Sequence, residues 1–188
     1  GNYDGLYVLN KSGDSWRLRN KIAGFDNSAR HFEAFKGDIF VNHEYKGVFR
    51  LKMDEAYSAA TQVTVDTELI CHNSGMVRYR DQLLYGCASG IYAFDFTSGE
   101  FAKDSALSQA YTQDTYVSGK LNVDDRDGFL WVFSKSGIHY ISEDNFGNSP
   151  VINTIPLAEK DRNSVVGYES VLPLPKSGNY LFGTSSGY

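Results

Sequence analysis

The chain has 188 residues, of which 41% are hydrophobic and 22% charged, and its mean hydropathy of -0.37 is typical of a globular protein with room for a core. A net charge of -5 argues against nucleic-acid binding by this segment, and no apolar run approaches the roughly 18 to 20 residues of a membrane helix. Two cysteines are too few for a disulfide scaffold or a cysteine-rich zinc site, while 14% aromatic residues favour β structure.

One phrase recurs along the chain, a glycine followed by a short apolar strand. Its copies are Gly5-Leu6-Tyr7-Val8-Leu9, Gly47-Val48-Phe49-Arg50-Leu51, Gly90-Ile91-Tyr92-Ala93-Phe94, Gly137-Ile138-His139-Tyr140-Ile141 and the truncated Gly187-Tyr188. The glycines lie 42, 43, 47 and 50 residues apart. Blades of β-propellers repeat at roughly 40 to 50 residues, so the spacing predicts an all-β propeller of four-stranded antiparallel blades.

Each complete copy is preceded by a tight turn and a second apolar strand. Lys36-Gly37-Asp38, Arg80-Asp81-Gln82, Arg126-Asp127-Gly128 and Ser177-Gly178-Asn179 supply these turns. In the second full unit we expect strands at residues 76–79, 83–87, 91–95 and 101–104. Helical periodicity is nearly absent, and only residues 104–116 could hold one short helical turn.

The repeats divide the chain into about four blade equivalents of a single propeller segment. The predicted parts are a half blade (1–25), three blades (26–70, 71–117 and 118–166) and a second half blade (167–188). The two half blades could meet and close a four-bladed ring, or the chain could be an arc of a larger propeller. We favour the arc, because both ends fall inside a blade. Open blade edges would then favour self-association.

The third unit resembles the repeat of the two-component regulator propellers, which runs Asp-x-x-Gly-x-Leu-Trp-x-Gly-Thr-x-x-Gly-Leu. The matching segment is Asp124-Asp125-Arg126-Asp127-Gly128-Phe129-Leu130-Trp131-Val132-Phe133-Ser134-Lys135-Ser136-Gly137-Ile138. Tyr180-Leu181-Phe182-Gly183-Thr184 also carries the Gly-Thr pair, whereas Val41-Asn42, Gly86-Cys87 and Phe133-Ser134 replace it elsewhere. The resemblance covers nearly the whole chain.

The resemblance implies a periplasmic sensor region of a bacterial membrane-anchored regulator. In that family an extracytoplasmic propeller precedes a triple-tyrosine domain and a membrane helix, and the output is a histidine kinase or a LuxR-type helix-turn-helix. This chain would then sense a ligand such as a glycan or its breakdown product, with the rest of the parent sensor as its partner. The family offers no catalytic residue to transfer.

Propeller topology predicts where a ligand would bind. The connections between blades and those between the second and third strands of a blade emerge on one face, around the channel mouth. The mouth candidates are Arg30, His31, His43, Glu44, Tyr45, His72, Asn73, Tyr168 and Glu169. Aromatic and histidine rings with Arg, Asn and Glu hydrogen-bonding groups suit a small polar molecule or an oligosaccharide.

Metal and nucleophile chemistry is less well supported by the sequence. His31, His43 and His72 show no short H-x-x-H spacing, and Asp124-Asp125 with Asp127 lacks the order of a calcium loop. Ser136-Gly137 is not part of a Gly-x-Ser-x-Gly elbow. We therefore assign no catalytic residue, metal or cofactor. Cys71 and Cys87 are expected to be inert thiols, with an intrablade disulfide as the alternative.

Two other function classes stay open. The chain could be a propeller lyase or hydrolase acting on a polysaccharide or lactone, with Glu169, His31, His43 or His72 as the acid and base. It could also be a protein-interaction scaffold, as many propellers are. A sensor segment that binds but does not turn over its ligand is the interpretation that we favour.

Overall fold

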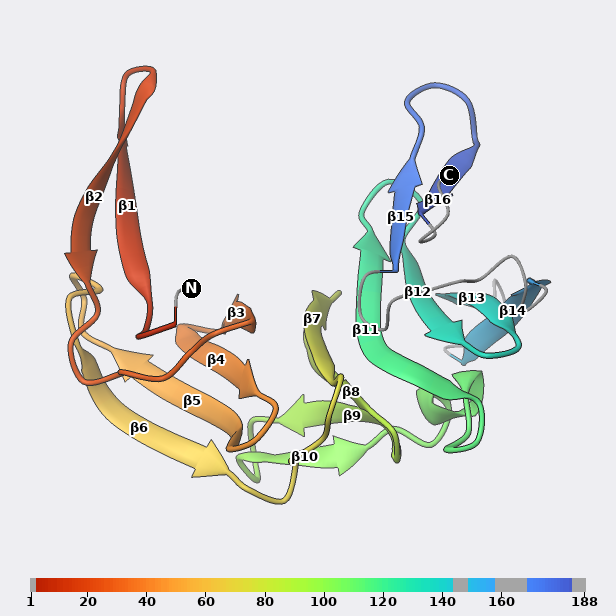
Figure 1. The fold of residues 1–188 in the computed structure, drawn as a ribbon, viewed down its shortest axis with the longest axis horizontal. Coiled ribbons are helices and arrows are strands. Elements are labelled where there is room, and N and C mark those ends of the chain that lie inside the picture. Colours follow the sequence, from red (N-terminus) through yellow and green to blue (C-terminus); the bar gives the residue numbers. More distant parts are fainter. Residues whose placement is uncertain (1–2, 144–148, 158–168, 184–188) are drawn as a thin grey trace. The chain divides into compact units, whose positions relative to one another are not determined.

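The computed structural model describes residues 3–143, 149–157 and 169–183 (Figure 1). Within these residues all regular structure is β-strand, except for the 3-10 turn η1 (Leu107–Ala110). The chain divides into two compact units, Gly1–Cys71 and His72–Tyr188, which are described separately. None of the described helical segments is long and apolar enough to cross a membrane.

The first unit consists of a hairpin and a four-stranded antiparallel sheet. The hairpin pairs β1 (Tyr7–Ser12) with β2 (Ser15–Lys21). The sheet, called sheet I, follows the chain order β3 (His31–Phe35), β4 (Asp38–His43), β5 (Gly47–Met53) and β6 (Ala60–Asp66). Apolar residues that alternate along the strands face each other between the hairpin and sheet I. The buried ones are Leu6, Ile22, Phe25, Val41, Phe49 and Leu51.

The second unit holds two more four-stranded sheets and a further strand pair. Sheet II follows the chain order β7 (Gly75–Tyr79), β8 (Gln82–Cys87), β9 (Gly90–Asp95) and β10 (Glu100–Lys103). Sheet III follows the order β11 (Tyr116–Asp124), β12 (Phe129–Ser134), β13 (Gly137–Glu143) and β14 (Pro150–Pro156). The strand pair joins β15 (Ser170–Pro173) to β16 (Tyr180–Gly183).

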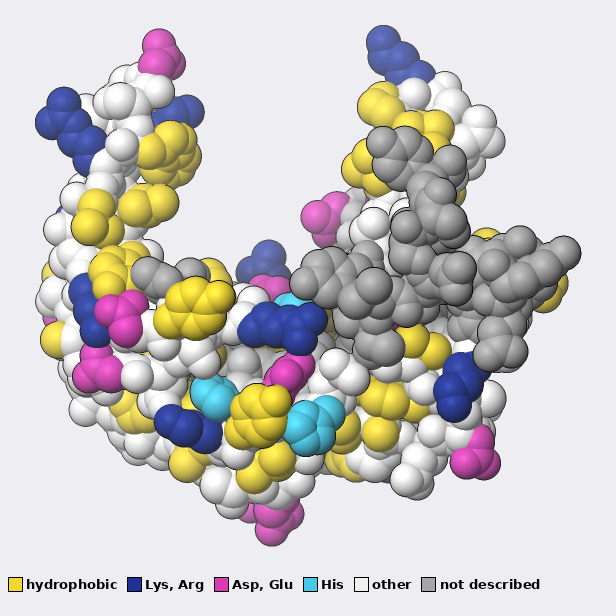
Figure 2. Space-filling model, in the orientation of Figure 1, with side chains coloured by type: hydrophobic (Ala, Val, Ile, Leu, Met, Phe, Trp, Pro, Cys, Tyr) yellow, Lys and Arg dark blue, Asp and Glu magenta, His cyan; other side chains and the backbone are white. Residues whose placement is uncertain are grey.

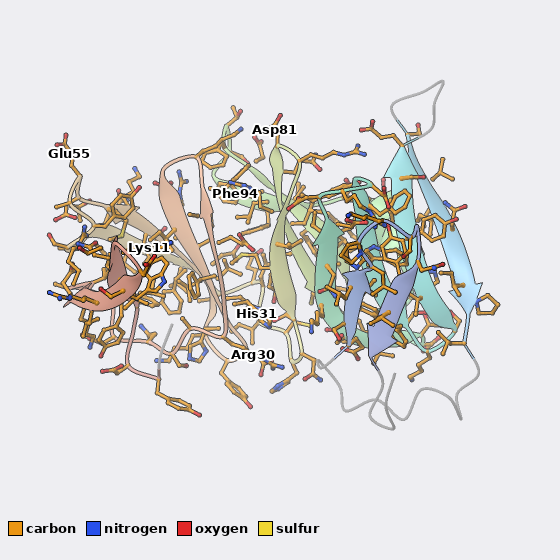
Figure 3. The ribbon with its side chains drawn as sticks, turned by 90° about the horizontal axis from the view of Figure 1, so that it is seen from above. Lys11, Arg30, His31, Glu55, Asp81 and Phe94 are labelled. Atoms are coloured by element: carbon orange, nitrogen blue, oxygen red, sulfur yellow. The ribbon has the colours of Figure 1, made fainter. Side chains whose placement is uncertain are left out.

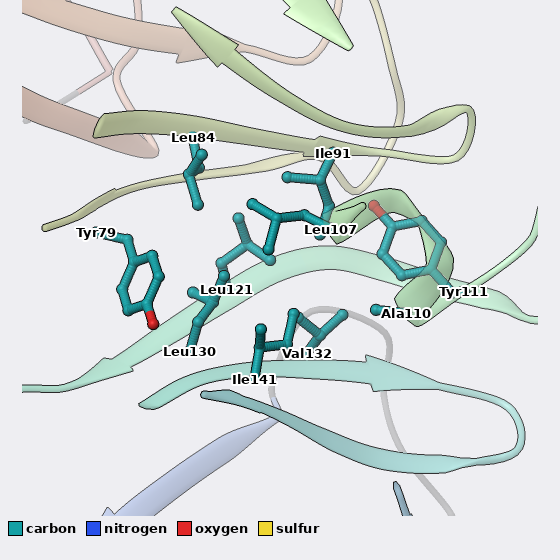
Figure 4. Close-up of a cluster of buried hydrophobic side chains, with 10 residues drawn as sticks. All are labelled: Tyr79, Leu84, Ile91, Leu107, Ala110, Tyr111, Leu121, Leu130, Val132 and Ile141. Atoms are coloured by element: carbon teal, nitrogen blue, oxygen red, sulfur yellow. The ribbon is translucent and has the colours of Figure 1, made fainter. Parts of the chain in front are cut away.

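Sheets II and III pack face to face through one apolar cluster (Figure 4). Leu84 and Ile91 of sheet II lie opposite Leu130 and Val132 of sheet III, and the η1 segment closes one side with Leu107. Burial of each such side chain contributes about 1.5 to 3 kcal/mol. The opposite face of sheet III packs on the β15–β16 pair through a second cluster, which contains Trp131, Phe133, Ile138, Val171, Tyr180 and Phe182.

The strand pattern expected from the repeat is confirmed. Strands β7 to β10 occupy the positions predicted for the second unit to within one residue at their starts and ends. The expected helical turn in residues 104–116 is also present as η1, and the amides of Leu107 and of the preceding Ala106 donate to the carboxylate of Asp104. Four-stranded meanders that stack face to face within a unit are consistent with a propeller-like arrangement, and no closed ring is detected among the described residues.

Candidate functional site

Two loops of the first unit meet at one end of sheet I. The segment before β3 carries Arg30, and the β4–β5 connection begins at His43, at the end of β4. Because β3 and β4 are antiparallel, with His31 opposite Asn42, the start of β3 lies beside the end of β4. Figure 3 shows Arg30 and His31 at this end and Glu55, in the β5–β6 turn, at the other.

These loops line a cavity of about 460 Å³. Small-molecule sites in proteins are typically clefts of roughly 300 to 1,000 Å³, so the cavity is of suitable size. Its walls are Tyr3, Ser28, Ala29, Arg30, Asn42, His43, Glu44 and Tyr45. The lining therefore combines aromatic rings with hydroxyl, amide, imidazole, guanidinium and carboxylate groups.

An ion pair crosses the cavity wall. Arg30 Nη1 lies 2.6 Å from Glu44 Oε1, and the Glu44 side chain is the less exposed of the two. Beside this pair, Lys46 Nζ donates a hydrogen bond to Asn27 Oδ1 at 2.5 Å, which links the same two loops a second time. The cation and the anion of the lining neutralise each other, so the cavity offers hydrogen-bonding groups without a large net charge.

His43 is held by a backbone contact and by two aromatic rings. The Tyr45 amide donates to His43 Nδ1 at 3.2 Å, so the neutral ring carries its proton on Nε2 and can donate a hydrogen bond from there. The Tyr45 and Phe49 rings each lie with centroids 6.3 Å from that of His43, in edge-on orientations. Phe49 belongs to the buried core, and this contact ties the site to sheet I.

The structure brings four of the predicted site residues together, namely Arg30, His43, Glu44 and Tyr45. His31 starts β3 next to Arg30 but does not line the cavity. His72 and Asn73 belong to the second unit, where their carbonyl oxygens accept hydrogen bonds from the Tyr116 hydroxyl at 3.2 and 2.9 Å.

The last two predicted site residues lie near the start of β15. Tyr168 is outside the described residues. Glu169 is buried in the second unit, where Ser118 Oγ donates to its Oε2 at 3.1 Å, and its Oε1 has no hydrogen-bond partner among the described residues. The Glu169 carboxylate is thus packed inside the unit rather than offered to solvent.

The list of mouth candidates leaves out four lining residues, Tyr3, Ser28, Ala29 and Asn42. Ser28 and Ala29 stand in the same loop as Arg30, so their proximity could have been predicted from the chain. Asn42 occupies the position of the Thr in the repeat's Gly-Thr pair, which marks the strand end that leads into the cavity. Tyr3 has no such signal, because it precedes β1 and reaches the cavity only through the packing of the first unit.

The remaining histidine and the two cysteines, which could also carry reactive or metal chemistry, do not line the cavity. His139 is buried, with Nε2 2.7 Å from Ser134 Oγ and Nδ1 3.0 Å from Thr154 Oγ1. Cys71 and Cys87 are not joined in a disulfide, and they are half-buried and buried respectively. Over the described parts of the chain, no cluster of three or more His, Cys, Asp or Glu side chains could hold a metal ion.

Comparison with known proteins gives no family for this chain. No family model matches it, and neither the curated proteins nor the solved structures include a match.

Proposed function

We propose that this chain is a ligand-binding β-propeller segment of a bacterial transmembrane signalling or transcription regulator, exposed in the periplasm, and that the cavity of its first unit receives the ligand. The observation that supports the proposal is the cavity of about 460 Å³ between two polar loops at the end of sheet I, with Tyr3 and Tyr45 in its lining. The propeller and its periplasmic place rest on the repeat resemblance. The stacked four-stranded meanders of the structure are consistent with a propeller-like arrangement.

The chemistry of the lining suits a neutral, hydroxyl-rich molecule. Tyr3 and Tyr45 are strongly exposed, and their rings can cover the apolar face of a sugar at little entropic cost. Arg30, Glu44 and the Nε2 of His43 supply donors and acceptors for hydroxyl groups. Because Arg30 and Glu44 neutralise each other, a phosphate or a polyanion would have to displace Glu44 from the guanidinium. A neutral oligosaccharide or its breakdown product therefore fits better.

Sensing would follow from a shift in the populations of two arrangements of the cavity loops, one with the loops together and one with them apart. A ligand that contacts both loops favours the arrangement in which they lie together, and the parent protein would transmit this preference through its membrane helix. The size of the response is limited by the difference in ligand affinity between the two arrangements.

Titration calorimetry and thermal unfolding with a panel of neutral and uronic-acid oligosaccharides test the proposal. A ligand at 100 times its Kd stabilises the folded state by about 2.7 kcal/mol, which raises the melting temperature visibly. We expect Tyr45→Ala to lose at least about tenfold in affinity, equal to about 1.4 kcal/mol. Tyr57→Ala is the matched control, since Tyr57 is an exposed tyrosine in the β5–β6 turn, away from the cavity lining.

The possible outcomes separate the function classes. Binding that is lost in Tyr45→Ala and kept in Tyr57→Ala supports the proposal. Turnover of the bound saccharide would instead assign the cavity to a lyase or hydrolase. Equal binding by both variants would exclude the cavity as the site.

A further inference from the structure

A chain of hydrogen bonds leads from the turn between β12 and β13 to a buried imidazole. Ser136, in this turn, is exposed, and its Oγ lies 2.8 Å from the Oγ of Ser134, the buried last residue of β12. Ser134 Oγ lies 2.7 Å from His139 Nε2, and His139 Nδ1 lies 3.0 Å from Thr154 Oγ1 on β14. The exposed hydroxyl of Ser136 is therefore connected to a base through one intervening hydroxyl.

The hydrogen bonds of Ser134 indicate the direction of this chain. The Ser136 amide donates to Ser134 Oγ at 3.2 Å, which leaves the Ser134 proton available for donation. The Gly137 carbonyl oxygen is 3.4 Å away and His139 Nε2 is 2.7 Å away, so the imidazole is the better acceptor. The neutral ring then carries its proton on Nδ1 and donates it to Thr154. In this state Nε2 can take up a proton as a general base.

His139 differs from the histidines at the surface. Figure 2 shows histidine side chains that reach the surface of the molecule, whereas His139 is 6% exposed. It lies opposite Val132 on β12 and opposite Thr154 on β14. Because solvent hardly reaches this imidazole, it can act on an outside molecule through a hydroxyl that it contacts, and Ser134 is in that position.

The equivalent turn of sheet II provides a comparison within the same chain. Cys87-Ala88-Ser89-Gly90-Ile91-Tyr92 aligns without a gap with Ser134-Lys135-Ser136-Gly137-Ile138-His139. Ser89 is exposed, as Ser136 is, but its Oγ lies 3.6 Å from Cys87 Sγ and 2.9 Å from the Tyr92 hydroxyl. A phenol hydroxyl is no base at neutral pH. Of these two equivalent serines, Ser136 is the one connected to an imidazole.

We propose that Ser136 is a nucleophile that accepts an acyl group from an activated ester, and that His139 removes its proton through Ser134. Ser136 Oγ attacks the carbonyl carbon of an aryl ester, the bond from that carbon to the aryl oxygen breaks, and the aryloxide leaves with the bonding electron pair. The Ser136 proton goes to Ser134 Oγ while the Ser134 proton goes to His139 Nε2. The imidazolium later loses this proton to solvent, and Ser136 is left as an O-acyl serine.

The backbone of the turn accounts for the choice of an activated ester. The Lys135 amide donates to the Thr115 carbonyl at 2.7 Å, and the Ser136 amide donates to Ser134 Oγ. Neither amide is directed at the attacked carbonyl oxygen, so the charge that develops there depends on solvent. An amide or an alkyl ester also needs a proton on its leaving group, which the buried Ser134 is poorly placed to deliver. An aryl ester does not, because its leaving group is a stable anion.

Acetylation of the wild-type chain by para-nitrophenyl acetate tests the proposal without any substitution. Peptide mapping by mass spectrometry measures the acetyl group on Ser136 and on Ser89 in the same sample. We expect Ser136 to react about 100-fold faster, since a positioned general base typically contributes that much or more. Hydroxylamine removes acetyl from serine but not from the neighbouring Lys135, which separates the two products. Equal rates at Ser136 and Ser89 would overturn the proposal.

Substitutions identify the nucleophile. Ser136→Ala should abolish the hydroxylamine-sensitive acetyl group of this turn. Ser89→Ala is the matched control and should leave the reaction at Ser136 unchanged, because Ser89 holds the same repeat position in sheet II. If the hydroxylamine-sensitive acetyl group of the β12–β13 turn persisted in Ser136→Ala, Ser136 would not be the nucleophile.

The pH dependence of acetylation tests the role of His139. His139→Gln keeps a hydrogen-bonding side chain but cannot take up the proton, so acetylation of Ser136 should slow by about 100-fold. In the wild type the rate should rise as the imidazole becomes neutral, between about pH 5 and 8, and this rise should be absent in His139→Gln. Thermal unfolding shows that the variant is folded. A rate and a pH profile that match the wild type would show that His139 does not act as the base.

The inference is independent of the ligand proposal. The cavity lies in the first unit and Ser136 in the second. Tyr45→Ala should leave acetylation of Ser136 unchanged, and Ser136→Ala should leave oligosaccharide binding unchanged, so each proposal can fail without the other.

Discussion

The amide nitrogen of Gly119 donates a 2.7 Å hydrogen bond to the carbonyl oxygen of Asn73, which joins β11 of sheet III to the segment before β7 of sheet II. The contact requires the backbones to approach closely. A side-chain carbon added at Gly119 would overlap the carbonyl group of Gly86. Glycine at 75, 86 and 119 thus lets β11 of sheet III touch the first two strands of sheet II, β7 and β8.

Gly119→Ala should therefore lower the free energy of unfolding by about 1 to 3 kcal/mol, because the strands must move apart. Gly128 is a useful control, since it is glycine for a different reason: its φ is +72° and nothing lies near its Cβ position. Asn tolerates this conformation, so Gly128→Asn should be close to wild type and Gly119→Asn strongly destabilised. Urea unfolding measures the free energy of unfolding of each variant. Equal losses in Gly119→Asn and Gly128→Asn would contradict the close-packing explanation.

Tyr180 connects β16 to the β11–β12 turn. Its hydroxyl lies 2.5 Å from an oxygen of Asp124 and 2.5 Å from an oxygen of Asp127, and the Asp127 carboxylate also accepts from Arg126 at 2.7 Å. Burial, followed by these hydrogen bonds, raises the pKa of Tyr180 well above its usual value. The hydrogen bonds from Tyr180 and then Arg126 lower the pKa of Asp127.

Tyr180→Phe should cost about 1 kcal/mol at neutral pH, since the site is partly screened by solvent. In the unfolded wild type, the Tyr180 hydroxyl loses its proton near pH 10.0, whereas in the folded chain it keeps the proton to a higher pH. The contribution of Tyr180 is therefore complete below that pH and is lost as the pH rises toward the folded pKa. We expect the wild-type advantage over Tyr180→Phe in urea unfolding to shrink above about pH 10. A constant difference up to pH 12 would argue against this linkage.

His139 is a buried link between two hydroxyl-bearing strands. Its ring nitrogens contact Ser134 on β12 and Thr154 on β14. His139→Leu keeps the volume roughly but leaves both hydroxyls short of a partner, so we expect a loss of about 1 to 3 kcal/mol. Ser134 retains its contact with Ser136 at 2.8 Å. Thr154→Val removes only one of the two hydroxyl contacts of His139, so it should cost less than His139→Leu, and thermal unfolding of the two variants checks that order.

The Arg30–Glu44 pair should matter little for stability. Both side chains reach solvent, and exposed ion pairs contribute about 0 to 1 kcal/mol. Arg30→Met, Glu44→Gln and the double variant should all unfold within about 1 kcal/mol of wild type, with a coupling energy below that value. Ligand affinity, in contrast, should fall in each variant. A large stability loss would show that the pair supports the loops rather than a ligand.

Much of the fold could be predicted from local patterns. The glycine phrases and turn residues placed strands such as β7 to β10 because a tight turn and an alternating apolar strand are decided by neighbouring residues. The end of sheet I that holds Arg30 and His43 was predictable for the same reason, since antiparallel pairing determines which loops lie side by side.

The repeat, the strand order within each sheet and the two loops that carry Arg30 and His43 thus follow from local sequence patterns. Three contacts do not: Tyr3 lines the cavity, Glu169 is buried against Ser118, and Tyr180 reaches Asp124 only in the folded chain. These contacts join residues from different sheets or strand pairs, or from outside the repeat. They depend on how one sheet packs on the next, and a pattern read along a single strand carries no information about that packing.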